Sequence, residues 1–61
     1  MNLEQLKQMT KQLIATHPNL KEELVDLFQL AVDEIDEGGS EMHECHLAYQ
    51  DMMELVDEHK A

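Results

Sequence analysis

The chain has 61 residues, of which 43% are hydrophobic, and a formal net charge of −10. A chain this short forms a single domain, residues 1–61, and its charge opposes direct binding to nucleic acid or to anionic membranes, whose phosphates attract cationic side chains. The hydrophobic fraction is too high for a disordered acidic tail, and the single cysteine cannot form an internal disulfide.

The sequence carries no targeting signal that we recognise. Residues 1–5 lack a basic segment followed by an apolar run, and no apolar stretch approaches the ~18 residues that span a bilayer. A lone cysteine is typical of a reducing compartment. We therefore expect a cytoplasmic protein without a membrane partner.

The first predicted helix covers about residues 3–16. Its apolar residues recur at helical spacing and form one stripe, namely Leu3, Leu6, Met9, Leu13 and Ile14. Asn2 is a favourable N-cap residue, and Gln5, three positions later, completes a capping-box pattern. Pro18 lacks a backbone donor and disfavours helical geometry at His17, so we expect the helix to end there.

The second predicted helix covers about residues 20–36. Asn19 is expected to cap it, with Glu22 at the capping-box position. Its apolar residues occupy a broad arc, namely Leu20, Leu24, Leu27, Phe28, Ala31 and Ile35, flanked by Val25 and Val32. Leu30 falls outside this arc. So broad an arc predicts contact with two neighbouring helices, which makes this helix the centre of the fold.

The third predicted helix covers about residues 41–58. Gly38 suits the left-handed conformation that ends a helix, and Ser40 suits the cap of the next one. The predicted inner face consists of Met42, Cys45, Ala48, Tyr49, Met52, Met53 and Val56. Leu47 falls outside this face, and Leu55 lies at its margin. Because the link is short, we expect an all-α, antiparallel three-helix bundle.

The stretch from Asp33 to Glu44 holds six acidic residues around two glycines. Four of them stand at the end of the second predicted helix, where the helix dipole disfavours negative charge, namely Asp33, Glu34, Asp36 and Glu37. Local stability therefore does not explain them. The simplest interpretation of a charged run is a solvated surface, and recognition of a partner is the alternative.

The same stretch partly follows the pattern of a calcium-binding EF-hand loop. Numbered from Asp33, it offers carboxylates at positions 1, 5, 9 and 12 and Gly38 at position 6. However, Ile35 stands at ligand position 3, and Ser40 replaces the apolar residue of position 8. The ligand set is incomplete, so we predict no calcium site.

Three residues of the third helix raise the questions of transition-metal binding and of catalysis. His43 and His46 are one helical turn apart and flank Cys45, but a closed zinc site needs four ligands. Neighbouring positions on one helix do not face each other, and nearby acids raise a thiol pKa, which opposes a nucleophilic role. We predict no enzyme and no cofactor; metal binding by these three residues between subunits stays open.

Acids on successive helical turns lie roughly 5–6 Å apart and can imitate the charge of a nucleic-acid backbone. In charge, size and helicity, the chain resembles small acidic DNA-mimic inhibitors, several of them encoded by phages. Residues 33–44 also resemble segments of short tailed-phage proteins. The likeness to DNA mimics implies a modulator of a nucleic-acid-binding protein, working in a host cytoplasm if a phage encodes it, whereas the likeness of residues 33–44 covers about a quarter of the chain and implies nothing about activity.

We therefore predict a non-enzymatic module that binds a protein partner with a basic surface. The acids expected to contact the partner are Glu22, Asp26, Asp33, Asp36, Glu37, Glu41 and Glu44. Leu30, Leu47 and Leu55 are expected to add apolar contact. Two alternatives are a structural homo-oligomer, such as a homodimer, without an electrostatic partner, and a metal-binding helical hairpin.

Overall fold

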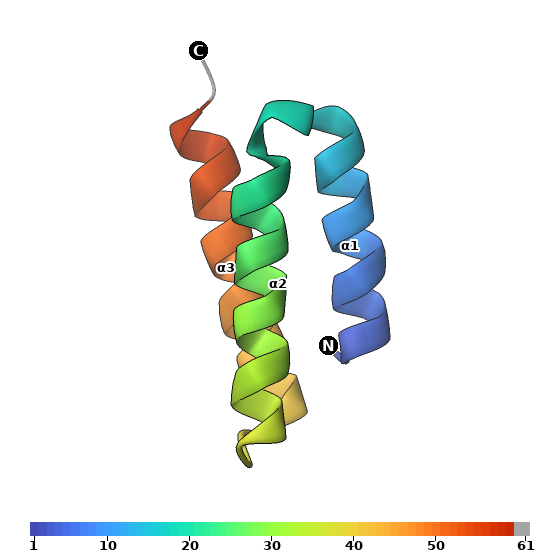
Figure 1. The fold of residues 1–61 in the computed structure, drawn as a ribbon, viewed down its shortest axis with the longest axis vertical. Coiled ribbons are helices and arrows are strands. Elements are labelled where there is room, and N and C mark those ends of the chain that lie inside the picture. Colours follow the sequence, from blue (N-terminus) through green and yellow to red (C-terminus); the bar gives the residue numbers. More distant parts are fainter. Residues whose placement is uncertain (60–61) are drawn as a thin grey trace.

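The computed structural model describes residues 1–59 and contains three α-helices and one short 3₁₀ helix, without a strand in that range. α1 spans Leu3–Thr16, η1 Pro18–Leu20, α2 Lys21–Asp36 and α3 Glu41–Glu58. Figure 1 shows them side by side in an up-down-up arrangement that measures 37 × 17 × 17 Å. The prediction of an all-α three-helix bundle is confirmed.

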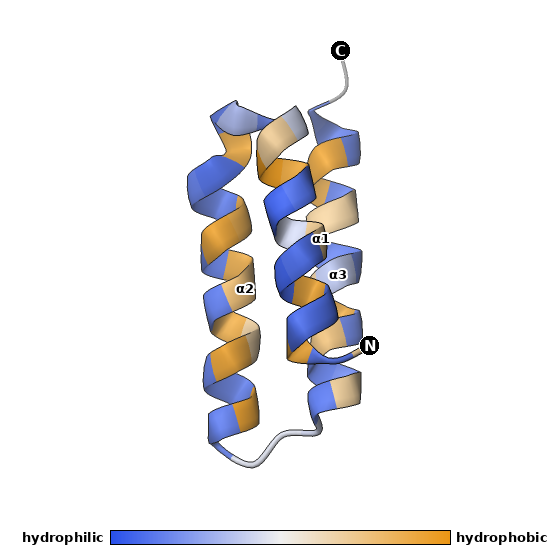
Figure 2. Ribbon diagram, turned by 90° about the vertical axis from the view of Figure 1, so that its right-hand side faces the viewer, coloured by the Kyte–Doolittle hydropathy of each residue, from blue (hydrophilic) through white to orange (hydrophobic). Residues whose placement is uncertain are grey.

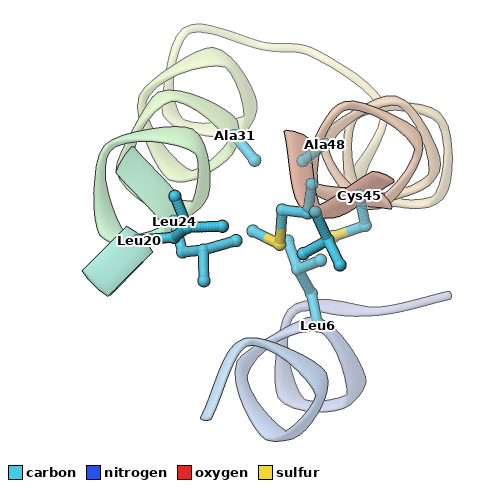
Figure 3. Packing of buried hydrophobic residues seen from close by; sticks show 8 residues of the cluster. Leu6, Leu20, Leu24, Ala31, Cys45 and Ala48 are labelled. Atoms are coloured by element: carbon cyan, nitrogen blue, oxygen red, sulfur yellow. The ribbon is translucent and has the colours of Figure 1, made fainter. Parts of the chain in front are cut away.

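Eight buried apolar side chains form the core between the helices (Figure 3). Each helix contributes to this set, which consists of Leu6, Leu20, Leu24, Ala31, Cys45, Ala48, Met52 and Val56. α2 contacts α1 and α3 more extensively than those two helices contact each other. The broad apolar arc of α2 thus meets two neighbours, as its sequence predicted.

Both ends of α1 follow the local sequence. The Asn2 side chain accepts a hydrogen bond from the Gln5 amide at 2.8 Å, and the Gln5 side chain accepts one from the Asn2 amide at 3.1 Å. His17 leaves helical geometry (φ −131°, ψ 66°) directly before Pro18. The predicted capping box and proline break are confirmed.

The start of α2 differs from the prediction. Asn19 lies inside η1 and does not cap α2, which begins after Leu20 without a side-chain cap hydrogen bond. Pro18 opens η1, and the Leu20 amide donates to the His17 carbonyl at 2.9 Å. Because proline presets a helical φ, the chain is already wound at Asn19, whereas a capping residue needs extended backbone.

Two glycines end α2. Gly38 adopts φ +108°, and its amide donates to the Ile35 carbonyl at 3.0 Å. The Gly39 amide donates to the Glu34 carbonyl at 2.9 Å, which completes a Schellman motif. The Ser40 side chain then caps α3. The predicted roles of Gly38 and Ser40 are confirmed.

Some methionines do not lie where helical periodicity predicts. Met42 and Met53 are 69% and 40% exposed, although both belong to the predicted inner face of α3. Met9 is half-buried at a surface hollow, and Thr10 is buried instead, with its hydroxyl donating to the Leu6 carbonyl at 2.7 Å. α1 contacts α3 less than it contacts α2, so part of the apolar arc of α3, including Met42 and Met53, stays in solvent.

Candidate functional site

The outer side of α2 carries a row of exposed acidic residues, which we call the acidic row: Glu22, Asp26, Asp33, Asp36 and Glu37. Figure 2 shows the hydrophobic side of α2 turned toward the other helices and its hydrophilic side turned outward. In Figure 1 and Figure 2 the last turn of α2 and the link to α3 extend past the start of α1. The row therefore ends on a part of the hairpin that α1 does not cover.

The C-terminal end of the acidic row stands at an electrostatically unfavourable place. The last turn of α2 contains no basic residue. Each carboxylate near a helix C-terminus destabilises it by about 0.3–1 kcal/mol at low ionic strength. Asp33 accepts a hydrogen bond from the Gln29 side chain at 3.1 Å, one turn earlier on the same exposed face. Asp36 and Glu37 thus lower the stability of the hairpin that displays them.

Glu41 has a role inside the chain. Its Oε2 atom accepts a hydrogen bond from the Leu3 amide at 2.8 Å, between residues 38 positions apart. The first amides of a helix have no partner within the helix, so Glu41 satisfies one of these donors in α1. This carboxylate therefore ties α1 to α3.

A shallow groove of about 200 Å³ runs between α2 and α3, and no α1 residue lines it. We call it the α2–α3 groove, and its lining residues are Leu27, Leu30, Ala31, Glu34, Glu44, Leu47, Ala48 and Asp51. Figure 3 shows Ala31 and Ala48 directed toward one another between the two helices. Because these side chains are short, the groove between the two helices is not filled at this position. Leu30 and Leu47, which also line it, are 55% and 41% exposed.

Some of the predicted contact residues line this groove, and others do not. Glu44, Leu30 and Leu47 line it together, whereas Leu55 is partly buried against the core and does not line the groove. The prediction also missed Asp51, whose carboxylate lines the groove. Its position, one turn after Leu47 on the same side of α3, is the sequence signal that could have identified it.

The thiol of Cys45 is inside the core. Burial raises the pKa of the Cys45 thiol, and the carboxylates of Glu41 and Glu44 raise it further, against the opposing effect of the N-terminal amino group. A thiol with a raised pKa holds its proton and is a poor nucleophile at neutral pH. The side chain contributes to packing at this position.

The histidines beside Cys45 point elsewhere. His43 and His46 are exposed, and a ring nitrogen of His46 lies 3.2 Å from the Gln50 amide nitrogen. Within residues 1–59, no three histidine, cysteine or acidic side chains converge as ligands for one metal ion. α2 also continues through Asp36, where an EF-hand loop that begins at Asp33 would require non-helical backbone.

No protein-family model, curated protein or solved structure matches the chain. In the described part of the chain, no helix has both the length and the apolar composition that a membrane crossing requires.

Proposed function

We propose that the protein is a non-enzymatic module that binds a basic surface of another protein. The observation that supports this most directly is the acidic row, which is exposed and ends where negative charge destabilises the helix. Natural proteins commonly give up stability at positions that serve function. A merely solvated face could be built equally well from acids placed at helix N-termini, where they stabilise.

The dimensions of the row support a nucleic-acid-binding protein as the class of partner. Glu22 and Asp36 are separated by about 21 Å along the helix axis, at 1.5 Å per residue. That length corresponds to about six nucleotides of one DNA strand, at 3.4 Å per charge. A basic groove that accommodates a nucleic-acid strand can therefore accommodate this row, as in the small acidic DNA-mimic inhibitors that the chain resembles.

The mechanism that we propose is electrostatic steering followed by occupation of the basic groove. Complementary charge raises the rate of encounter and selects the orientation of the bound complex, and salt weakens both effects. The protein acts as an inhibitor or modulator, because a partner that holds the row cannot hold nucleic acid at the same groove.

Two variants of equal net charge test the proposal. The first neutralises part of the row through Asp26→Asn, Asp33→Asn, Asp36→Asn and Glu37→Gln. The matched control removes four acids elsewhere through Glu4→Gln, Glu54→Gln, Asp57→Asn and Glu58→Gln. Both variants and the original chain are immobilised, basic proteins are captured from a lysate at low salt, and each captured protein is then assayed in purified form by titration.

We expect the row variant to bind the purified partner at least roughly tenfold more weakly than the control, as a loss of about 1.4 kcal/mol produces. We also expect the affinity of the original chain to fall steeply with salt. Equal binding by the two variants, or an affinity that salt does not change, contradicts the proposal.

A further inference from the structure

We infer that the α2–α3 groove binds one amphipathic α-helix of the protein partner, with an apolar stripe flanked by basic residues. This inference rests on the proposed function and adds to it the form of the partner segment. It also assigns a role to two leucines that the bundle itself does not use.

The apolar surface of the groove comes from both helices. Leu30 of α2 and Leu47 of α3 are 55% and 41% exposed and line one groove together with the half-buried Leu27. Single exposed leucines are common on protein surfaces and need no explanation. Two that share one concave surface, each outside the apolar arc of its own helix, form a surface that an apolar side chain can fill.

Three carboxylates frame this surface. Glu34 of α2 and Glu44 and Asp51 of α3 line the same groove. Glu44 and Asp51 are seven positions apart, which is about 10.5 Å or two turns of helix. A bound helix with apolar anchors at positions i, i+4 and i+7 repeats its flanking residues over the same two turns. Lysine or arginine at those flanking positions would therefore meet carboxylates on both sides.

The shape of the groove selects a helix. It lies between two antiparallel helices, and packed helices are spaced 8–10 Å apart with side chains of one in the grooves of the other. A helix bound there would take the place of the fourth helix of a bundle. Because residues 1–59 contain no strand, they offer no sheet edge to which an extended segment could add.

The charge of the groove disfavours a second copy of the chain as its occupant. Two copies that met through this face would bring Glu34, Glu44 and Asp51 of each against those of the other, and each chain carries a net charge of −10. Like charges brought together at an interface oppose association. A basic helix instead gains attraction from the same three residues.

The probe is a fluorescein-labelled synthetic peptide of about 14 residues, or about four helical turns, with leucines at helical spacing and lysines on both flanks. A peptide of the same composition in scrambled order removes the stripe, and a peptide with glutamate for lysine reverses the charge. Anisotropy at low salt measures binding to the full chain, and amide chemical shifts of the labelled protein locate it. We expect only the first peptide to bind, with the largest shifts at Leu30, Leu47 and Ala48.

Leu30→Gln and Leu47→Gln are each expected to weaken binding of this peptide roughly tenfold, because each removes partial burial of a leucine side chain. Met53→Gln is the matched control, since Met53 is 40% exposed and does not line the groove. All three positions are exposed, so circular dichroism is expected to show unchanged folds. Equal binding of the scrambled peptide, no binding of the first peptide, or equal effects of Leu30→Gln and Met53→Gln overturns the inference.

Sedimentation of the chain alone tests the second copy as occupant. A dimer that Leu30→Gln dissociates overturns the basic helix as the occupant of the groove, whereas a monomer supports it. The two proposals fail separately. If the groove variants have no effect while the acidic-row variant still loses the captured partner, only the groove inference is wrong; if the acidic-row variant keeps the partner, the proposed function is wrong whatever the peptide does.

Discussion

The Leu3 amide donates a hydrogen bond to the Glu41 carboxylate at 2.8 Å, and this contact joins the first turns of α1 and α3. Both helices run in the same direction, so one carboxylate lies near the positive ends of two helix dipoles. Glu41 therefore stabilises the end of the bundle at which α1 and α3 begin, next to the Gly38–Ser40 link.

Replacing Glu41 with alanine is expected to lower the free energy of unfolding by about 1 kcal/mol, because the Leu3 donor loses its acceptor and both helix ends lose a favourable charge. Glu41→Gln keeps an acceptor, so its free energy of unfolding should lie between those of the original chain and of Glu41→Ala. Urea unfolding followed by circular dichroism measures the difference. Glu54→Ala, in the C-terminal part of α3 and away from Leu3, is the control. An equal effect of the two alanine variants would show that the contact with Leu3 does not contribute.

The left-handed backbone at Gly38 predicts opposite effects for the two mirror forms of alanine. L-alanine at φ +108° is expected to destabilise the protein by about 1–2 kcal/mol, because its Cβ approaches the following carbonyl oxygen. D-alanine, introduced by chemical synthesis, favours positive φ and restricts the unfolded chain, so it should stabilise by up to about 1 kcal/mol. Thermal unfolding of the two synthetic chains decides; equal melting temperatures would contradict the Schellman geometry.

Gly39 is restricted by its surroundings. A Cβ atom at this position would lie 2.8 Å from the Glu34 carbonyl oxygen, which is a backbone atom within the last turn of α2. Gly39→Ala is therefore expected to cost about 1–3 kcal/mol, since the Schellman hydrogen bond must lengthen to admit the methyl group. Ser40→Ala is the comparison, with an expected loss of about 0.5–1 kcal/mol from the missing cap. Urea unfolding that ranks Ser40→Ala as the more damaging variant would refute this account.

Neutralising acids at the two ends of α2 is expected to change stability in opposite directions. Asp36→Asn and Glu37→Gln should each raise the free energy of unfolding by about 0.3–1 kcal/mol at low salt, because they remove negative charge from the negative end of the dipole. Glu23→Gln, in the first turn, should lower it by a similar amount. Unfolding is measured in low and high salt, and changes of the same sign at both ends would exclude the dipole as their cause.

The raised pKa of the Cys45 thiol predicts a loss of stability in alkaline solution. The folded thiol has the higher pKa, so the unfolded chain releases its proton first as the pH rises past the ordinary value of 9.0. The unfolded state then binds fewer protons, and the free energy of unfolding falls by at most about 1.4 kcal/mol per pH unit for this group. The pH dependence of unfolding is compared with that of Cys45→Ala, which lacks the thiol. The range is about pH 8 to 10, on the order of one unit either side of the ordinary thiol pKa. Parallel curves for the two proteins over this range would contradict the prediction.

Local sequence patterns were sufficient for the helices and for most of their ends. The Asn2–Gln5 capping box and the Gly38 helix end depend on residues within one turn of each other, so the sequence contains everything that determines them. Asn19 is the exception, because two local signals competed there and the preset φ of Pro18 prevailed.

The site required the tertiary structure, because helical periodicity states on which side of its own helix a residue lies but not how much of that side a neighbour covers. Met42 and Met53 are therefore exposed and Thr10 is buried, against their hydropathy. For the same reason Leu30 and Leu47 were identifiable only as residues outside two separate arcs. Packing of α2 against α3 is what brings them together in one groove.

The acids divide in the same way. Composition alone marks the chain as acidic and places an unfavourable cluster at the end of α2. Only the packed bundle separates a carboxylate that binds the Leu3 amide from those that frame a groove, because that distinction depends on distances between residues of different helices. Residue spacing along one helix does not predict such distances, since they arise when side chains far apart in the sequence come into contact.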